Sequence, residues 1–369
     1  MVTCPAQPVS SGLFAPRRGL RYTSSMRPLP EPRHILVHLP NWLGDVVMAT
    51  PALRALRRRF PAARITWVGR AGCCALLEGL PHADAILPLP ARPGVRDMYR
   101  LARALPSRPD LGIALPHSAR AALLLWAAGC RARLGYDRGG RRHLLTHTVP
   151  PYTENGSVAP IYMAQEYLNL LAPLGVAGDE GGLELWADPS LVRELRSRLS
   201  PSRPVVGLAP GAAFGPSKQW LPERFAEVAS RLTRELGAQC LLFTGPGEEE
   251  TREAVLRAAS VPLVDPQEGA PSVARLRAGV AACDLLIGND SAPRHIAIAF
   301  GVPVLCIMGP TSPRYTESPW ERGEVIRIDV DCGPCQKPRC ATDHRCMTGI
   351  SAERVFQSAS RWLAPAAAE

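Results

Sequence analysis

Three short segments place polar or ionisable side chains directly after apolar, β-rich runs, where ligand-binding groups gather in α/β proteins. The side chains are Asp45 in the first segment, Lys218 in the second, and Asp290, Ser291 and His295 in the third. A carboxylate can take a proton from an attacking hydroxyl, and a lysine beside free backbone N–H groups can hold a phosphate. Together the segments indicate general base chemistry on an anionic ligand.

Asp45 follows an apolar run at 34–40 and a turn at 41–44, and it precedes a helical pattern over 46–59. This order predicts that Asp45 lies at or next to the N-cap of the helix, while Pro51 argues against a straight helix. Two roles remain open. Asp45 is a general base at the mouth of a cleft, or it only caps the helix.

Lys218 lies near the end of a loop at 210–220 that is rich in Gly, Ala and Pro. Small residues let backbone N–H groups approach a phosphate, and the lysine adds a full positive charge. The GxxxxGK[ST] spacing of a P-loop is absent. Among 43 Lys and Arg residues, only Lys218 and Lys337 are lysines, which favours a need for a compact point charge. The alternative is an ordinary turn-rich loop with an exposed lysine.

The third segment precedes an apolar helical run that ends at Phe300. Asp290 and Ser291 are predicted to cap this helix, whose free N–H groups and dipole favour a diphosphate. His295 lies one turn further on and either contacts the ligand or is a structural histidine.

Two segments contain arginines, one at 115–120, where a predicted strand ends, and one at 136–142. Arginine pairs well with phosphate or carboxylate groups. Arg120, with Ser118 close to it, is therefore predicted to bind an acidic acceptor, the alternative being a solvated basic face.

Four of the eleven cysteines lie close together near the C-terminus, with His344 between the last two: Cys332, Cys335, Cys340 and Cys346. They could hold a structural zinc ion, form disulfides or remain free thiols, and their spacing is not that of a standard zinc finger. The odd number of cysteines, and the lack of an apolar leader in residues 1–30, favour a reducing cytoplasm.

Strands that alternate with helices must position these segments. Strands are predicted at 34–40, 64–69, 85–89 and 111–115, and a second cycle at 204–209, 240–244, 284–288 and 304–308. The pattern predicts an α/β protein with two doubly wound parallel sheets, and a ligand cleft where the two halves face each other. The expected divisions are a disordered tail or mis-assigned start at 1–30, an N-terminal domain at 31–178, a linker at 179–203, a C-terminal domain at 204–350 and a final helix at 351–369.

The composition narrows the class of protein. The 369 residues are 46% hydrophobic and carry a net charge of +10, which indicates a globular chain with anionic partners. No apolar run approaches the roughly 20 residues of a membrane-spanning helix. Nucleic acid, a membrane surface and phosphorylated small molecules all fit the charge. Nucleic-acid binding is the weaker alternative, because the charge forms no stripe and no recognition motif is present.

Four segments, taken in order, resemble glycosyltransferase family 9, the ADP-heptose:lipopolysaccharide heptosyltransferases. They are NWLGDVVMATPALRAL, PGAAFGPSKQW, NDSAPRHIAIAFGVPVLCIMGPTSP and CGPCQKPRC with the following HRCM. The resemblance covers roughly residues 34–357. It implies a GT-B fold of two Rossmann-like domains, with the acceptor on the first and the nucleotide sugar on the second. It also implies an inverting transfer that needs neither a metal nor another cofactor.

The resemblance assigns a role to each candidate residue. Asp45 would be the base that activates the acceptor hydroxyl, and Lys218 would pair with the donor diphosphate. The remaining donor-binding positions are Glu248 on the ribose, Asp290 on the sugar hydroxyls, Ser291 and the N–H of Ala292 on phosphate, and His295 nearby. Ala292 departs from the family's usual glycine, and a positive φ there would strain it.

The same resemblance implies the partners. ADP-heptose is the expected donor and a lipid-linked saccharide, the lipopolysaccharide inner core, the expected acceptor. The enzyme would work on the cytoplasmic face of the inner membrane through peripheral contact, with arginines and Trp42 near the headgroups. No nucleic acid partner is expected. A family member that uses another sugar or acceptor is the alternative, because pocket details decide the donor.

Overall fold

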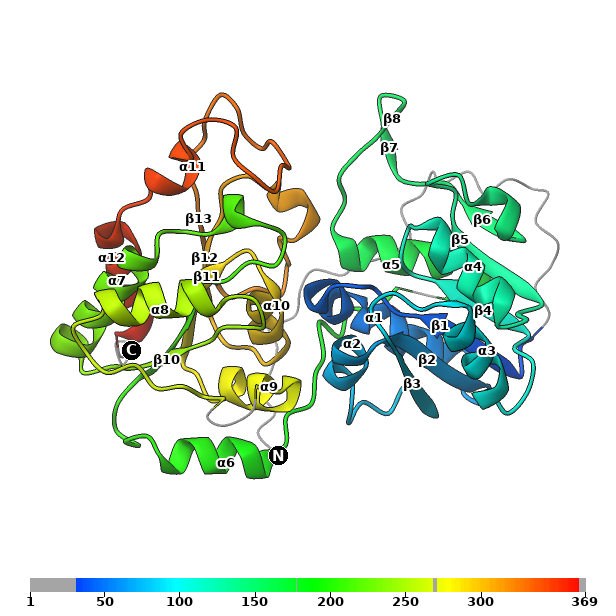
Figure 1. Ribbon diagram of the computed structural model, residues 1–369, viewed down its shortest axis with the longest axis horizontal. Coiled ribbons are helices and arrows are strands. Elements are labelled where there is room, and N and C mark those ends of the chain that lie inside the picture. The colour runs from blue at the N-terminus through cyan, green and yellow to red at the C-terminus, as the bar shows by residue number, and fades with distance from the viewer. Residues whose placement is uncertain (1–30, 177, 268–270, 365–369) are drawn as a thin grey trace. The chain divides into compact units, whose positions relative to one another are not determined.

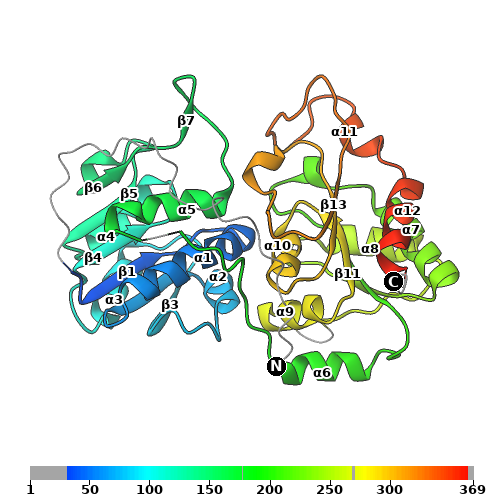
Figure 2. The same ribbon diagram turned by 180° about the vertical axis from the view of Figure 1, so that it is seen from behind.

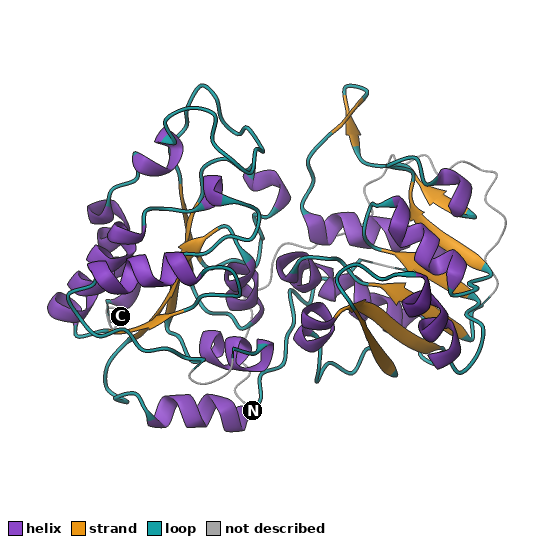
Figure 3. Ribbon diagram, in the orientation of Figure 1, coloured by secondary structure: helices purple, strands orange, loops and turns teal. Residues whose placement is uncertain are grey.

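The computed structural model describes residues 31–176, 178–267 and 271–364, and the tail predicted at 1–30 lies outside them. The chain divides into two units between Trp186 and Ala187. Each unit contains a parallel sheet that is accompanied by helices (Figure 1, Figure 3). This arrangement confirms the α/β class with two doubly wound sheets that the sequence predicts.

A six-stranded parallel sheet forms the centre of the first unit, in the order β3-β2-β1-β4-β5-β6. Its strands are β1 (His34–His38), β2 (Arg64–Arg70), β3 (Ala85–Leu89), β4 (Leu111–Ala114), β5 (Ala132–Tyr136) and β6 (His147–Val149). A short ribbon of β7 (Thr153–Glu154) and β8 (Ser157–Val158) stands apart from it. The strand order reverses between β1 and β4, and open α/β sheets bind ligands at such a point.

Two groups of helices flank this sheet. Helix α1 (Leu43–Arg59) packs against α2 (Ala71–Leu76) and α5 (Met163–Leu171), whereas α3 (Val95–Ala104) packs against α4 (Ala119–Ala127). Leu101 of α3 and Leu124 of α4 share a buried cluster with sheet residues. Helices α3 and α4 therefore cover the same face of the sheet.

Helix α1 continues through Pro51, which the sequence suggested as an obstacle. A proline has no N–H to donate to the carbonyl four residues earlier, here that of Val47. The Thr50 hydroxyl donates to this carbonyl at 2.7 Å instead. The carbonyl that Pro51 leaves without its helical partner is thus satisfied within the same turn.

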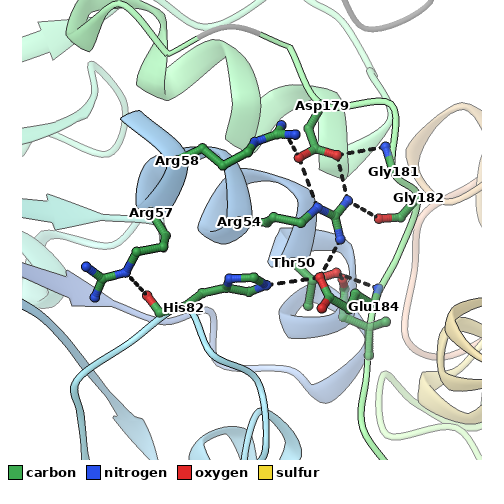
Figure 4. A network of polar contacts seen from close by, with 10 residues as sticks. Thr50, Arg54, Arg57, Arg58, His82, Asp179, Gly181, Gly182 and Glu184 are labelled. Atoms are coloured by element: carbon green, nitrogen blue, oxygen red, sulfur yellow. Dashed lines mark hydrogen bonds and ion pairs between the residues drawn. The ribbon is translucent and has the colours of Figure 1, made fainter. Parts of the chain in front are cut away.

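The last residues of the first unit are fastened to α1 by ion pairs (Figure 4). Arg54 reaches Asp179 and Glu184, each with a closest N–O distance of 2.5 Å, and Arg58 also contacts Asp179 at 2.5 Å. His82 lies 3.0 Å from the Glu184 carboxylate and, with Arg54, holds the pKa of Glu184 down to about 2. Because the Asp179 side chain is completely buried, this network fixes the exit of the chain from the unit.

The second unit contains a five-stranded parallel sheet in the order β10-β9-β11-β12-β13. The strands are β9 (Val205–Ala209), β10 (Gln239–Leu242), β11 (Leu285–Asn289), β12 (Val304–Ile307) and β13 (Gly323–Ile326). The helices are α6 (Pro189–Ser197), α7 (Pro222–Leu236), α8 (Glu249–Ala258), α9 (Val273–Ala281), α10 (Ala292–Ala299), α11 (Arg345–Thr348) and α12 (Ala352–Leu363). Helices α7 and α12 lie side by side, as Figure 2 shows from behind.

The segment expected as a linker, 179–203, contains helix α6. Asp188 caps this helix by accepting a hydrogen bond from the Ser190 N–H at 2.8 Å, and Pro189 occupies its first turn. Both are ordinary helix-start residues.

No helix in the part of the chain that the structure describes is long and apolar enough to cross a membrane.

Candidate functional site

Asp45 lies inside the first turn of α1, because the helix begins at Leu43 and Trp42 occupies the N-cap. The predicted position of Asp45 at or next to the N-cap was therefore wrong. Helix α1 packs against α5, and the charge of Asp45 contributes to raising the pKa of Glu166 and of Tyr167 on that helix. Helix α1 follows β1 directly, so Asp45 stands at the carboxyl end of the sheet.

Glu166 is a second carboxyl group at this edge, and sequence reasoning did not identify it. It is 5% exposed, and burial, against the charge of Arg138, raises its pKa to about 7. His117, in the loop after β4, lies 3.3 Å from Glu166, and burial lowers its pKa to about 4. Between these two pKa values both groups are largely neutral, so their contact is not an ion pair.

Arg138, in the loop after β5, completes this cluster. Its Nη1 lies 3.4 Å from Glu166 and 3.5 Å from Nδ1 of His117. Arginine donates only, so Nδ1 of a neutral His117 accepts and its Nε2–H faces Glu166. Buried groups with shifted pKa values are typical of functional sites. The sequence motifs could not identify Glu166, because this residue lies within an ordinary helical sequence outside all of them.

Ser118 is the N-cap of α4 and Arg120 lies in its first turn, so Arg120 belongs to the helix and not to the strand-end loop that the sequence predicted. Ser118 caps the helix by accepting from the Ala121 N–H at 3.3 Å. Both residues line a pocket of about 390 Å³ together with His38, Asn41 and Arg70. The pocket lies where β1, β2 and β4 end, at the reversal of strand order.

In the second unit, Lys218 is held by Asp290. The Lys218 ammonium donates to the Asp290 carboxylate at 2.7 Å and to its backbone carbonyl at 3.0 Å. The Thr311 hydroxyl donates to the same carboxylate oxygen at 2.9 Å. Burial alone would raise the pKa of Asp290, but the charges of Lys218 and Arg294 hold it well below its usual range. Lys218 is thus fixed in place, which argues against the ordinary exposed lysine.

Arg294 anchors Asp290 from the other side, and sequence reasoning overlooked it. Its guanidinium is completely buried and donates to the free Asp290 oxygen at 2.9 Å. It also makes two hydrogen bonds of 2.6 Å to Glu321. Glu321 precedes β13, so the pair ties this loop to α10. The positive charges of Lys218 and Arg294 thus balance the negative charges of Asp290 and Glu321.

Asn289, also missed, connects β11 to the loop that carries Lys218. Its amide donates to the Pro210 carbonyl at 2.6 Å, and its side-chain oxygen accepts from the Trp220 N–H at 3.0 Å. Trp220 is itself fully buried, and its indole N–H donates to the Ile350 carbonyl. Both ends of the loop 210–220 are therefore fixed to the neighbouring strand.

The N-terminus of α10 carries a side-chain hydroxyl that has no hydrogen-bond partner. Ser291 occupies the N-cap, but its side chain makes no capping bond and its buried hydroxyl has no partner. Ser291 thus occupies the predicted cap position without a side-chain capping bond. The prediction that Asp290 also caps the helix was wrong, because Asp290 pairs with Lys218 instead. Buried polar groups without partners are rare in proteins, and the Ser291 hydroxyl is one of the few in the described part of the second unit.

Ala292 is the first residue of α10. Among the described non-glycine residues, positive φ occurs at Asn155, Gln336 and His344, so the strain considered for Ala292 does not arise. His295 is 3% exposed and its Nδ1 has no partner. Burial lowers the pKa of His295 to about 3, which keeps the ring neutral.

Glu248 lies at the start of α8 and accepts from the Gly245 N–H at 2.7 Å. Its carboxylate also lies against Gly211, where a Cβ atom would come within 2.0 Å of it. Gly211 therefore leaves room for Glu248 beside the loop of Lys218. Burial raises the pKa of this carboxyl group.

The four late cysteines line a small cavity of about 20 Å³ with His344 and Ser217. All described cysteines are free thiols. Within residues 31–176, 178–267 and 271–364, no group of three or more His, Cys, Asp or Glu side chains is arranged to hold a metal ion. His344 instead contacts the Ser217 carbonyl at 2.7 Å, next to Lys218.

Comparison with known proteins gives consistent results. The model of "Glycosyltransferase family 9 (heptosyltransferase)" matches residues 98–345. Lipopolysaccharide heptosyltransferase 2 of Salmonella typhimurium is 30% identical over 88% of this chain and 96% of that protein. The structure of E. coli ADP-heptose lps heptosyltransferase II has a TM-score of 0.72 at 26% identity, covering 89% of this chain and 98% of that one. A family 9 glycosyltransferase from Veillonella parvula gives a TM-score of 0.77 at 25% identity, covering 92% and 99%. The GT-B fold class that the resemblance implied is confirmed.

Proposed function

Because the chain belongs to glycosyltransferase family 9, we propose that it transfers heptose from ADP-heptose to a lipopolysaccharide inner-core acceptor, with inversion and without a metal ion. The observation that carries this proposal is the fixed Lys218–Asp290 pair beside the open N-terminus of α10. Such an arrangement suits the diphosphate of a nucleotide sugar. The alternative within the family is another nucleotide sugar or another acceptor.

The second unit would bind the donor. Lys218, the Ser291 hydroxyl and the first N–H groups of α10 supply positive potential for the diphosphate. Glu248 accepts a hydrogen bond from a ribose hydroxyl. The carboxylate of Asp290 orients both Lys218 and the sugar. The buried imidazole of His295 stays neutral. Negative charge grows on the β-phosphate as ADP leaves, so these fixed groups stabilise the transition state more than the bound donor.

The first unit would bind the acceptor. Asp45 takes the proton from an acceptor hydroxyl. At the same time the oxygen of that hydroxyl forms a bond to the anomeric carbon of the heptose. The bond from this carbon to the β-phosphate oxygen breaks at the same time, and ADP leaves with the electron pair. Attack opposite to the leaving group inverts the configuration. Arg120 and Arg70, which line the 390 Å³ pocket, suit the acidic groups of an inner core.

The partners set the place of action. A lipid-linked acceptor requires contact with the inner membrane, and we place this contact on its cytoplasmic face. The chain would be a peripheral protein there, and no nucleic acid takes part.

The test is to incubate the purified protein with ADP-heptose and a deacylated inner-core acceptor. ADP release together with a glycosylated product of inverted configuration is expected, and it should persist in excess EDTA. ADP-glucose and GDP-mannose in parallel reactions test the donor alternative. Faster transfer from either of them would replace ADP-heptose as the donor, and a retained configuration would refute the inverting mechanism.

A further inference from the structure

Two helices of the first unit expose large apolar side chains to solvent. On α3, Val95 is 85% exposed and Tyr99 is 61% exposed. On α4, Trp126 is 58% exposed and Leu123 is 37% exposed. Large apolar side chains that gather on a surface, rather than being scattered singly, mark an interaction site.

The exposed residues of each helix lie on one side of it. Val95 and Tyr99 are four residues apart, and Leu123 and Trp126 are three apart, which are the spacings of neighbours on a helix surface. The opposite sides of both helices are buried in the cluster shared with the sheet. Because α3 and α4 also pack against each other, their outward sides form one surface, which we call the α3–α4 face.

Arginines surround these apolar residues. One arginine lies in the turn before α3, three lie on α3 and one lies in the first turn of α4. They are Arg92, Arg96, Arg100, Arg103 and Arg120, and all of them are exposed. Asp97 is the acidic residue in residues 92–104, and its carboxylate accepts from the Gly94 N–H at 2.9 Å. Residues 119–127 contain no acidic residue. The face therefore has a clear positive charge.

The combination of the two features selects one kind of partner. Aromatic and aliphatic side chains bordered by arginines are typical of surfaces that lie in the headgroup region of an anionic bilayer. Long arginine side chains keep their charge at the phosphates while their stems lie along apolar groups. A nucleic acid would use the arginines but would leave Val95 and Leu123 in water. A neutral apolar partner would leave the arginines unmatched.

The face also continues into the pocket assigned to the acceptor. Arg120 and Leu124 of α4 line that pocket, as do Pro90 and Pro93, which precede α3. We propose that the α3–α4 face docks on the surface of an anionic lipid bilayer, with the acceptor pocket opening beside the headgroups. The proposal deepens the proposed function and rests on it only in the identity of the lipid-linked acceptor.

The experiment is sedimentation of the full chain with vesicles of mixed phosphatidylcholine and phosphatidylglycerol, and with vesicles of phosphatidylcholine alone. One variant carries Tyr99→Ser and Trp126→Ser, and another carries Arg96→Gln and Arg100→Gln. The matched control carries Trp362→Ser and Arg361→Gln on α12, which also exposes a tryptophan and an arginine.

We expect salt-sensitive binding to the anionic vesicles, with a partition coefficient that falls about fivefold for each arginine removed. The aromatic variant should also lose binding, and the control variant should not. Transfer to a deacylated, soluble acceptor should stay unchanged in both face variants, which shows that they fold. A lipid with a doxyl quencher should reduce the fluorescence of the wild type more than that of Trp126→Phe.

Several results would overturn the proposal. They are equal binding to phosphatidylcholine alone, equal loss in the α12 control, or face variants that bind vesicles normally. Loss of duplex DNA binding in the arginine variant, with vesicle binding retained, would assign the face to nucleic acid. Conversion of a dimer to a monomer by the face variants, with vesicle binding retained, would assign it to a second copy. The vesicle assay contains neither donor nor acceptor, so its failure is distinct from a failure of the transfer assay.

Discussion

Arg294→Met tests how strongly the buried charge network stabilises the second unit, where the proposed donor site lies. The change keeps most of the side-chain volume but leaves the two carboxylates of Glu321 and Asp290 without their shared cation. Both carboxylates are at most 7% exposed. Removing one partner of a buried ion pair costs about 3 to 5 kcal/mol. For a unit of this size, this corresponds to a fall in melting temperature of about 6 to 20 °C.

Differential scanning calorimetry measures this loss, and a double-mutant cycle assigns it. Glu321→Gln in the Arg294→Met background removes one unpaired carboxylate, so the double variant should be more stable than the sum of the single losses predicts, by about 1 to 3 kcal/mol. The control is Arg252→Met, which breaks a half-exposed pair with Asp265 and should cost far less. A loss in Arg294→Met no greater than in the control, or additive single losses, would refute the reasoning.

Three further predictions concern single groups. Lys218→Met should weaken ADP binding, measured by calorimetry, by about 10- to 100-fold through loss of a charge-assisted hydrogen bond, whereas Lys337→Met, the other lysine, should not change it. Glu166 has its folded-state pKa raised to about 7 from 4.5, so the folded state holds the extra proton and the free energy of unfolding should fall by up to about 3 kcal/mol as pH rises through this window. Glu166→Gln should remove that dependence in urea titrations, and an identical slope in the variant would contradict the assignment. Arg120→Gln should raise the KM for a phosphorylated acceptor about tenfold and leave the donor KM unchanged; equal effects on both would place Arg120 outside the acceptor site.

The sequence predicts β1 to β4 and β9 to β12, because each is a short apolar run that a turn or proline ends. It gives no strand for β5, β6 or β13, which complete the two main sheets. Helix starts are less predictable. Helix α1 begins before Asp45 because the Trp42 backbone adopts the cap conformation without a side-chain bond. The effect of Pro51 depends on the Thr50 hydroxyl, whose orientation no periodicity reveals. Helix α6 has a proper start at Asp188 and Pro189, but the surrounding glycines favour a loop.

The candidate site was predictable only where residues lie close in sequence. Lys218 and Asp290 were both singled out, yet their direct pairing depends on β9 and β11 being neighbours in the sheet. Arg294 and Glu321 form a buried pair across 27 residues, and a single arginine in an apolar helix gives no indication of that partner. Glu166 gains its properties from burial by α1 and the loops after β4 and β5, which only the fold supplies.

The most direct test of the account is the transfer rate of Asp45→Asn with ADP-heptose and the inner-core acceptor, measured beside its affinity for ADP. The amide keeps the size of the side chain but cannot take the proton. The account predicts that kcat falls by about 10²- to 10⁴-fold while ADP binds as in the wild type. Transfer at the wild-type rate would contradict it, because Asp45 would then not be the base.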